Sequence, residues 1–120
     1  MANTLSVTKR VYLFLVEKAM KRETTTYVEI AEAHGLPTTG NALGAALSPI
    51  LGSILEFCRD NKQPPLTALV VRKSGADQGL PGNGFWLMFG FKVENMNRET
   101  KRVMTDHYQS AVFDHYAELI

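Results

Sequence analysis

The chain of 120 residues is poor in cysteine: Cys58 is the only one. A single cysteine excludes an internal disulfide framework and a metal cluster held by several thiolates. It fits a reducing compartment, and we expect a cytoplasmic protein. Cys58 lies on the same apolar face of an expected helix as Leu51 and Ile54, which favours a buried structural thiol over a nucleophile.

The chain also has little net charge. A formal charge of +1 excludes a global attraction for nucleic acid or anionic lipid, so either partner would need a local patch. The stretch from Arg59 to Arg102 carries eight Lys and Arg residues against four Asp and Glu residues. This surplus is consistent with a local cationic surface, and equally with chance on a nearly neutral protein.

Charge is absent altogether from Gly35 to Leu55. Twenty-one residues could span a bilayer. Two prolines, four glycines and several hydroxyl side chains interrupt this stretch. We therefore expect no membrane span there, but buried or interface-forming structure in one domain over residues 1–120.

The sequence lacks the usual marks of a catalytic centre. It shows no clustered carboxylates, nucleophile–base pair, metal-ligand spacing or phosphate-binding loop. A repeated Asp-His-Tyr places His107 and His115 eight residues apart, about 12 Å along a helix, too far to chelate one metal ion alone. We expect a protein that is not an enzyme and that needs no cofactor and no metal.

Several helices are predicted by apolar periodicity and by capping residues. A helix over Val7–Lys21 has apolar residues at every fourth position. Thr26 and Glu29 form the pattern of a capping box before a short helix, Tyr27–His34, which ends at Gly35. The further expected helices are 40–47, with Thr38 or Thr39 as its cap; 49–60, with Ser48 as its cap and Pro49 at its first position; and 96–119.

Two strands are predicted around a glycine-rich segment. Leu66–Val71 is a nearly continuous apolar run, and Phe85–Phe91 alternates apolar residues on one face. The loop between them is too long for a tight turn. Placed after a helix, a turn and a helix, this hairpin predicts the wing of a winged helix. We expect an α+β, winged-helix-like domain with an additional C-terminal helix.

The expected wing and the third helix supply the candidate binding residues. Arg72 and Lys73 stand at the base of the wing, where cations and glycine N–H groups suit a phosphate backbone. The third helix has no Lys or Arg and offers Thr38, Thr39 and Asn41. The alternative for the glycine-rich segment is a mobile, solvated loop without a binding role.

Small residues recur at every fourth position in and after the third helix. Such a strip allows another backbone to approach closely, within the fold, in a dimer or along a sugar-phosphate chain. Close packing inside the fold or at a two-fold interface is the simpler interpretation. The members of the strip are Gly40, Gly44, Ser48 and Gly52.

The succession of "YVEIAEAHGLP", "GNALGAAL" and "PPLTALVVRKSGADQGLPGNG" resembles the DNA-binding domain of O6-alkylguanine alkyltransferases and alkyltransferase-like proteins. The resemblance covers about half of the chain, from Tyr27 to Gly84. It implies a recognition helix beginning near Asn41 and a glycine-rich loop, both directed at DNA. The whole chain also resembles small proteins carried on bacterial mobile gene cassettes or beside restriction loci.

The sequence departs from the alkyltransferase pattern at its reactive positions. Residues around Leu66 and Thr67 stand where that family has Cys-His-Arg, so no alkyl-accepting cysteine is carried over. The arginine of the family's recognition helix has no counterpart after Asn41. We therefore predict a non-enzymatic module that binds nucleic acid, DNA in the first place, through the wing and the third helix. The alternative is a homodimeric protein-interaction module or small-ligand-binding module that does not bind DNA.

Overall fold

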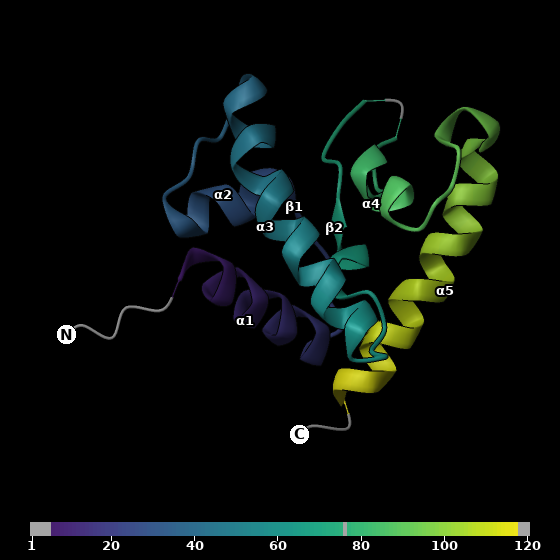
Figure 1. Cartoon of the computed structure of the whole chain (residues 1–120), viewed down its shortest axis with the longest axis horizontal. Coiled ribbons are helices and arrows are strands. Elements are labelled where there is room, and N and C mark those ends of the chain that lie inside the picture. The colour runs from purple at the N-terminus through teal and green to yellow at the C-terminus, as the bar shows by residue number, and fades with distance from the viewer. Residues whose placement is uncertain (1–5, 76, 118–120) are drawn as a thin grey trace.

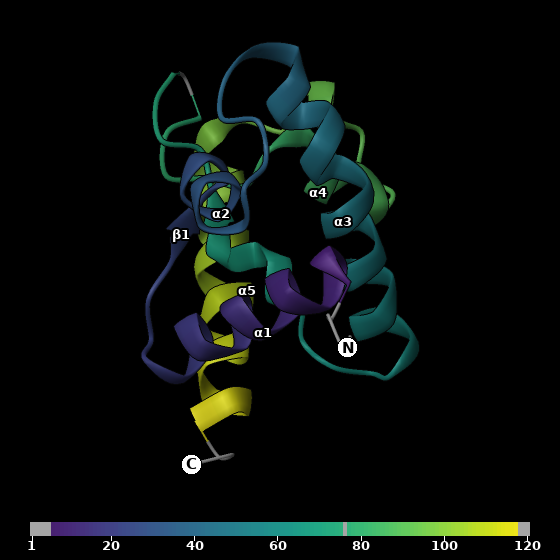
Figure 2. The same cartoon turned by 90° about the vertical axis from the view of Figure 1, so that its left-hand side faces the viewer.

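The computed structural model describes residues 6–75 and 77–117. The fold is α+β and mostly helical, with one small two-stranded parallel sheet. Helix α3 contacts α1, α2 and α4, while α5 packs against α1 and η1 (Figures 1 and 2). The elements in chain order are α1 (Val7–Met20), β1 (Thr25–Thr26), α2 (Tyr27–His34), α3 (Gly40–Asp60), the 3-10 helix η1 (Leu66–Leu69), β2 (Val70–Val71), α4 (Asn83–Met88), the 3-10 helix η2 (Val93–Asn95) and α5 (Arg98–Ala117).

The apolar side chains form two clusters. The first lies where α1, α3, η1 and α5 meet, and it includes the stripe Val11, Leu15 and Ala19 that the sequence predicted for α1. The second is smaller and is built around Trp86 and Phe85 of α4. Trp86 is fully buried. Helix α5 packs back on α1, which is one of the two positions expected for it. The predicted apolar residue Leu119 lies outside the described residues.

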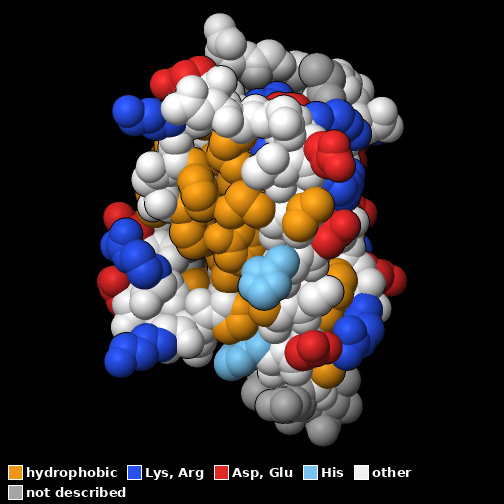
Figure 3. Space-filling view, turned by 90° about the vertical axis from the view of Figure 1, so that its right-hand side faces the viewer, with side chains coloured by type: hydrophobic (Ala, Val, Ile, Leu, Met, Phe, Trp, Pro, Cys, Tyr) orange, Lys and Arg blue, Asp and Glu red, His pale blue; other side chains and the backbone are white. Residues whose placement is uncertain are grey.

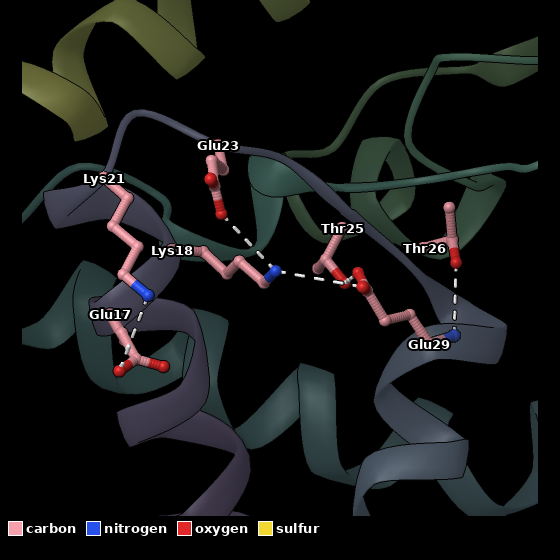
Figure 4. Close-up of polar contacts among 7 residues, drawn as sticks. All are labelled: Glu17, Lys18, Lys21, Glu23, Thr25, Thr26 and Glu29. Carbon is pink, nitrogen blue, oxygen red and sulfur yellow. Dashed lines mark hydrogen bonds and ion pairs between the residues drawn. The ribbon is translucent and has the colours of Figure 1, made fainter.

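The start of α2 confirms the local signals in the sequence. The Thr26 hydroxyl accepts a hydrogen bond from the N–H of Glu29 at 3.1 Å. Gly35 ends the helix in the left-handed conformation, with φ of 69°. The Glu29 carboxylate accepts a hydrogen bond from Thr25 and pairs with Lys18 of α1 at 3.8 Å (Figure 4). These contacts fix the beginning of α2 against α1.

The two helices predicted over 40–47 and 49–60 are one continuous helix, α3, so that prediction was wrong. Pro49 lies inside it, where it removes the hydrogen bond to the carbonyl of Ala45. Ala45 is exposed, so water can satisfy that carbonyl. Leu47 and Ile50, on either side of Pro49, are buried in the same cluster and keep the helix continuous.

The predicted wing is also corrected. Leu66–Leu69 is the 3-10 helix η1, and Phe85–Met88 belongs to α4, so the hairpin of strands 66–71 and 85–91 is not formed among the described residues. Strand β2 pairs instead with β1, in parallel, with Thr26 opposite Val71. Since both strands end at this pair, Tyr27 and Arg72 leave the sheet side by side.

Helix α3 is long and apolar enough to cross a membrane by length and composition, with a mean hydropathy of 1.3. The core helix of a globular fold meets the same criteria. Leu47, Ile50, Ile54 and Cys58 of α3 are buried against other elements of the chain, while 33% of the apolar window as a whole is buried.

Candidate functional site: a groove between α3 and α4

A groove of about 710 Å³ lies between α3 and α4, where the two apolar clusters meet. Its volume is within the range of small-molecule binding sites. The lining comes from α2, α3, η1, the segment after β2, and α4. The lining residues are Tyr27, Val28, Leu43, Gly44, Leu47, Ser48, Leu51, Gly52, Leu55, Thr67, Arg72, Lys73, Ser74, Gly82, Asn83, Gly84, Phe85, Leu87 and Met88.

One wall of the groove is the small-residue strip of α3. Gly44 and Ser48 are exposed and Gly52 is partly exposed, and all three line the groove. Beyond its chain neighbours and the backbone of its own helix, a Cβ atom added at Gly44 or Gly52 would meet no atom of the described residues within 4 Å. The strip is therefore not used for close packing inside the described chain, one of the two forms of the simpler interpretation; packing at a two-fold interface stays a prediction. Gly40, its first member, is exposed at the start of α3 and does not line the groove.

The opposite wall is fixed by Tyr27. Its hydroxyl oxygen accepts a hydrogen bond of 2.8 Å from the N–H of Gly82, just before α4. A Cβ atom at Gly82 would lie 2.9 Å from that oxygen and 3.5 Å from Nη2 of Arg72. Burial raises the pKa of Tyr27, and the Gly82 N–H and the Arg72 charge partly offset this rise. The phenol thus stays protonated at neutral pH and retains a proton to donate.

Arg72 and Lys73 bring positive charge to the groove. Both are exposed, and neither forms an ion pair within residues 6–75 and 77–117. The main chain of Arg72 closes the following loop: its N–H donates to Leu80 and its carbonyl accepts from Gly79. The main chain of Arg72 is therefore held at a fixed place, and the charges of Arg72 and Lys73 are available to a partner.

Cations of α5 have a different role. Lys101 is buried and pairs with Asp77 at 3.4 Å. Arg102 donates to the carbonyl of Gly79, and Arg98 donates to the carbonyl of Gln78. Part of the local surplus of Lys and Arg thus holds the loop after β2 in place, and this loop carries Arg72 and Lys73.

Thr67 of η1 also lines the groove. It is only 5% exposed, and its hydroxyl has no hydrogen-bond partner among the described residues. A buried hydroxyl without a partner costs about 1–3 kcal/mol. From the sequence, Thr67 was noted only because it stands near the position where the alkyltransferases have their Cys-His-Arg motif. Its place in the groove follows from the pairing of β1 with β2, a non-local contact that no local pattern indicates.

The predicted nucleic-acid contacts fall into two groups. Arg72 and Lys73 line the groove, while Thr38, Thr39 and Asn41 lie at the beginning of α3, outside the groove lining. Thr39 occupies the N-cap position of α3 without a side-chain hydrogen bond, so its hydroxyl is not used for capping. Asn41 is exposed in the first turn of the same helix.

Other candidate residues are accounted for by packing. Cys58 is 1% exposed within the first cluster, and burial raises the pKa of its thiol. Nδ1 of His34 lies 2.7 Å from the carbonyl of Ile30, four residues earlier in α2. Among the described residues, no group of three or more His, Cys, Asp and Glu side chains could hold a metal ion.

A second apolar surface covers the face formed by α4, η2 and α5 (Figure 3). Phe89 stacks on Tyr108 there, with ring centroids 5.2 Å apart and planes at 10°. Phe89 also contacts Phe85 and Phe91 through ring edges and faces. We refer to this surface, built from Phe89, Phe91 and Tyr108, as the aromatic surface.

Comparisons with models of protein families, with curated proteins and with solved structures find no match to this chain.

Proposed function

We propose that the protein is a non-enzymatic module that binds nucleic acid, DNA in the first place, across the mouth of the groove. The observation that carries the proposal is that Arg72 and Lys73, two cations without a partner in the described chain, line the same groove as the exposed face of α3. Unpaired cations beside approachable backbone suit a phosphate chain.

In this proposal α2 and α3 act as a helix-turn-helix pair. Thr38, Thr39 and Asn41 at the start of α3 donate hydrogen bonds to the backbone or to base edges. The loop after Arg72 takes the part of the wing of a winged-helix protein, although it is not a β-hairpin. Arg98, Lys101 and Arg102 serve this function indirectly, because they hold that loop.

The proposal is tested by the dependence of affinity on salt. If Arg72 and Lys73 each contact one phosphate, a plot of the logarithm of the association constant for duplex DNA against the logarithm of the salt concentration should have a slope of about −2. The affinity then falls about tenfold between about 50 and about 200 mM salt. Fluorescence anisotropy with labelled duplexes and single strands measures this. A protein that binds neither form at low salt contradicts the proposal.

A matched pair of variants locates the contact. Arg72→Gln combined with Lys73→Gln should abolish the salt dependence and lower affinity by about tenfold or more at low salt. Lys62→Gln combined with Lys92→Gln removes two exposed cations that do not line the groove and should leave binding nearly unchanged. Equal losses in the two double variants would show that only net charge matters.

A homodimeric protein-interaction module is the second candidate. It is favoured by the open strip Gly44, Ser48 and Gly52, which leaves room for a second backbone. Sedimentation velocity over a range of concentrations tests it. Under this candidate Gly44→Leu should shift a dimer towards monomer, whereas a wild-type chain that stays monomeric at all concentrations contradicts it.

A further inference from the structure

The groove has the features of a small-molecule site, beyond its proposed use by nucleic acid. Its lining is mainly apolar, with leucines of α3 facing Phe85, Leu87 and Met88 of α4. Small-molecule sites combine such walls with a few converging polar groups that fix orientation. The polar groups here are Thr67, Tyr27, Arg72 and Lys73, and each has hydrogen-bonding capacity or charge that the described chain does not use.

Thr67 distinguishes the groove from a simple gap between helices. Buried polar groups are nearly always hydrogen-bonded, and an orphan such as the Thr67 hydroxyl calls for a partner. The small residues of the facing α3 wall leave space for one, since Cβ atoms at Gly44 and Gly52 would contact nothing. The groove thus has the volume for a molecule that could supply a partner. The Thr67 oxygen is itself covered in the free protein, so a ligand would reach it only after the side chain turns about χ1.

The charges define the chemical class. Arg72 and Lys73 carry two positive charges, and no carboxylate lines the groove among the described residues. A cationic ligand would be repelled, and a neutral apolar ligand would leave both charges without a counter-ion. An anion with an apolar body matches both parts of the lining.

We propose that the groove binds an organic carboxylate with an apolar body, the body between α3 and α4 and the acid group held by Arg72 and Lys73. The Thr67 side chain then turns about χ1, so that its hydroxyl donates a hydrogen bond to the ligand. This site does not depend on the nucleic-acid proposal. Its test contains no nucleic acid, so the two proposals fail separately.

Octanoate is a suitable probe, with 1-octanol and octylammonium as neutral and cationic probes of the same length. Backbone amide shifts in nitrogen-15 NMR spectra report the position of binding. Gly44, Gly52, Gly82 and Gly84 line the groove, whereas Gly35, Gly75 and Gly90 do not. We expect octanoate to shift the first four amides and to bind at least about tenfold more tightly than 1-octanol, because charge-assisted hydrogen bonds are the stronger ones.

Two threonine variants form a matched control. Thr67 and Thr105 are both buried with hydroxyls that have no partner among the described residues, but only Thr67 lines the groove. Thr67→Val should weaken octanoate binding by about three- to tenfold, the effect of one hydrogen bond. Thr105→Val should leave it unchanged. Arg72→Gln combined with Lys73→Gln should make octanoate no better a ligand than 1-octanol.

Five results would overturn the proposal. The first four are no binding of octanoate at millimolar concentration, equal affinity for octanoate and 1-octanol, shifts confined to glycines outside the groove, and equal effects of the two threonine variants. Shifts of the groove glycines with protein concentration alone, without octanoate, would assign the groove to a second copy of the chain and would also overturn it.

Discussion

Helix α4 separates two apolar surfaces of different character. On one side Phe85, Leu87 and Met88 face the groove, which holds unpaired cations and an orphan hydroxyl. On the other side Phe89 covers Tyr108 in a stacked pair. The rings of the aromatic surface pack on one another, and Nε1 of Trp86 in the same cluster also has no hydrogen-bond partner among the described residues. The groove differs from it by the unpaired cations Arg72 and Lys73. Exposed apolar area alone therefore does not mark a site; the available charges beside it do.

Alkaline pH should produce the largest effect, and it should act mainly on the first apolar cluster, with Tyr27 alone at the groove. Burial raises the pKa of Tyr116 and Cys58 in the first cluster and of Tyr27 beside it. The unfolded chain releases these protons at the ordinary values, near pH 9 for Cys58 and pH 10 for the tyrosines, before the folded chain does. The contribution of these three groups to the free energy of unfolding is thus fully present well below pH 9 and decreases as the pH rises through the ordinary values and above.

Urea unfolding at several pH values measures this dependence. Tyr116→Phe should reduce the slope above pH 10, because its phenol no longer ionises in the unfolded state. Lys62→Gln, an exposed change, serves as the control. If the free energy of unfolding of Tyr116→Phe falls with pH as steeply as that of the wild type, burial of this phenol is not the cause of the pH dependence.

Two glycines at the groove should respond in opposite directions. A Cβ atom at Gly82 would approach the Tyr27 hydroxyl to 2.9 Å, so Gly82→Ala should cost about 1–3 kcal/mol of stability, the usual range for overpacking. Gly44 lies inside α3 with nothing near, so Gly44→Ala should stabilise by about 0.5–1 kcal/mol through helix propensity. Chemical denaturation checks both. A loss of stability in Gly44→Ala would mean that the strip is covered, by a second copy or by other packing.

Local signals in the sequence predicted the local structure well, because the interactions behind them are local. The Thr26 cap and the Gly35 terminus are examples. The alternation Phe85, Leu87, Phe89 was interpreted as a strand. Phe85 and Phe89 are also four residues apart, and in the structure their ring centroids are 5.1 Å apart at the end of α4. The same residues fit both periods, and the packing around Trp86 favours the helical one.

The groove could be predicted only in part. Arg72 and Lys73 were found from charge, and the strip of α3 from its spacing. Tyr27 and Thr67 were not identified as site residues, since their positions depend on the parallel pairing of Thr26 with Val71 across 45 residues of chain. No periodicity or motif within one segment carries that information.

The aromatic surface offers a test of intermediate size. Phe89→Ala removes the stacking on Tyr108 from a side chain that is 39% exposed, so we expect a loss of about 1–2 kcal/mol, less than for a fully buried ring. Val103→Ala, at 64% exposure, should change stability by less than about 0.5 kcal/mol. Neither variant should alter the affinity for DNA or octanoate. A binding defect in Phe89→Ala at unchanged stability would move the site from the groove to the aromatic surface.

The smallest expected effect compares the two orphan hydroxyls in the free protein. Replacing a buried, unpartnered hydroxyl by a methyl group removes a desolvation cost, so Thr105→Val should be neutral or stabilise by up to about 1 kcal/mol. The Thr67 oxygen is covered in the same way in the free protein, so Thr67→Val should give a similar gain. Thermal and urea unfolding measure both variants. A clearly smaller gain in Thr67→Val would indicate that water already reaches its hydroxyl from the groove when no ligand is bound.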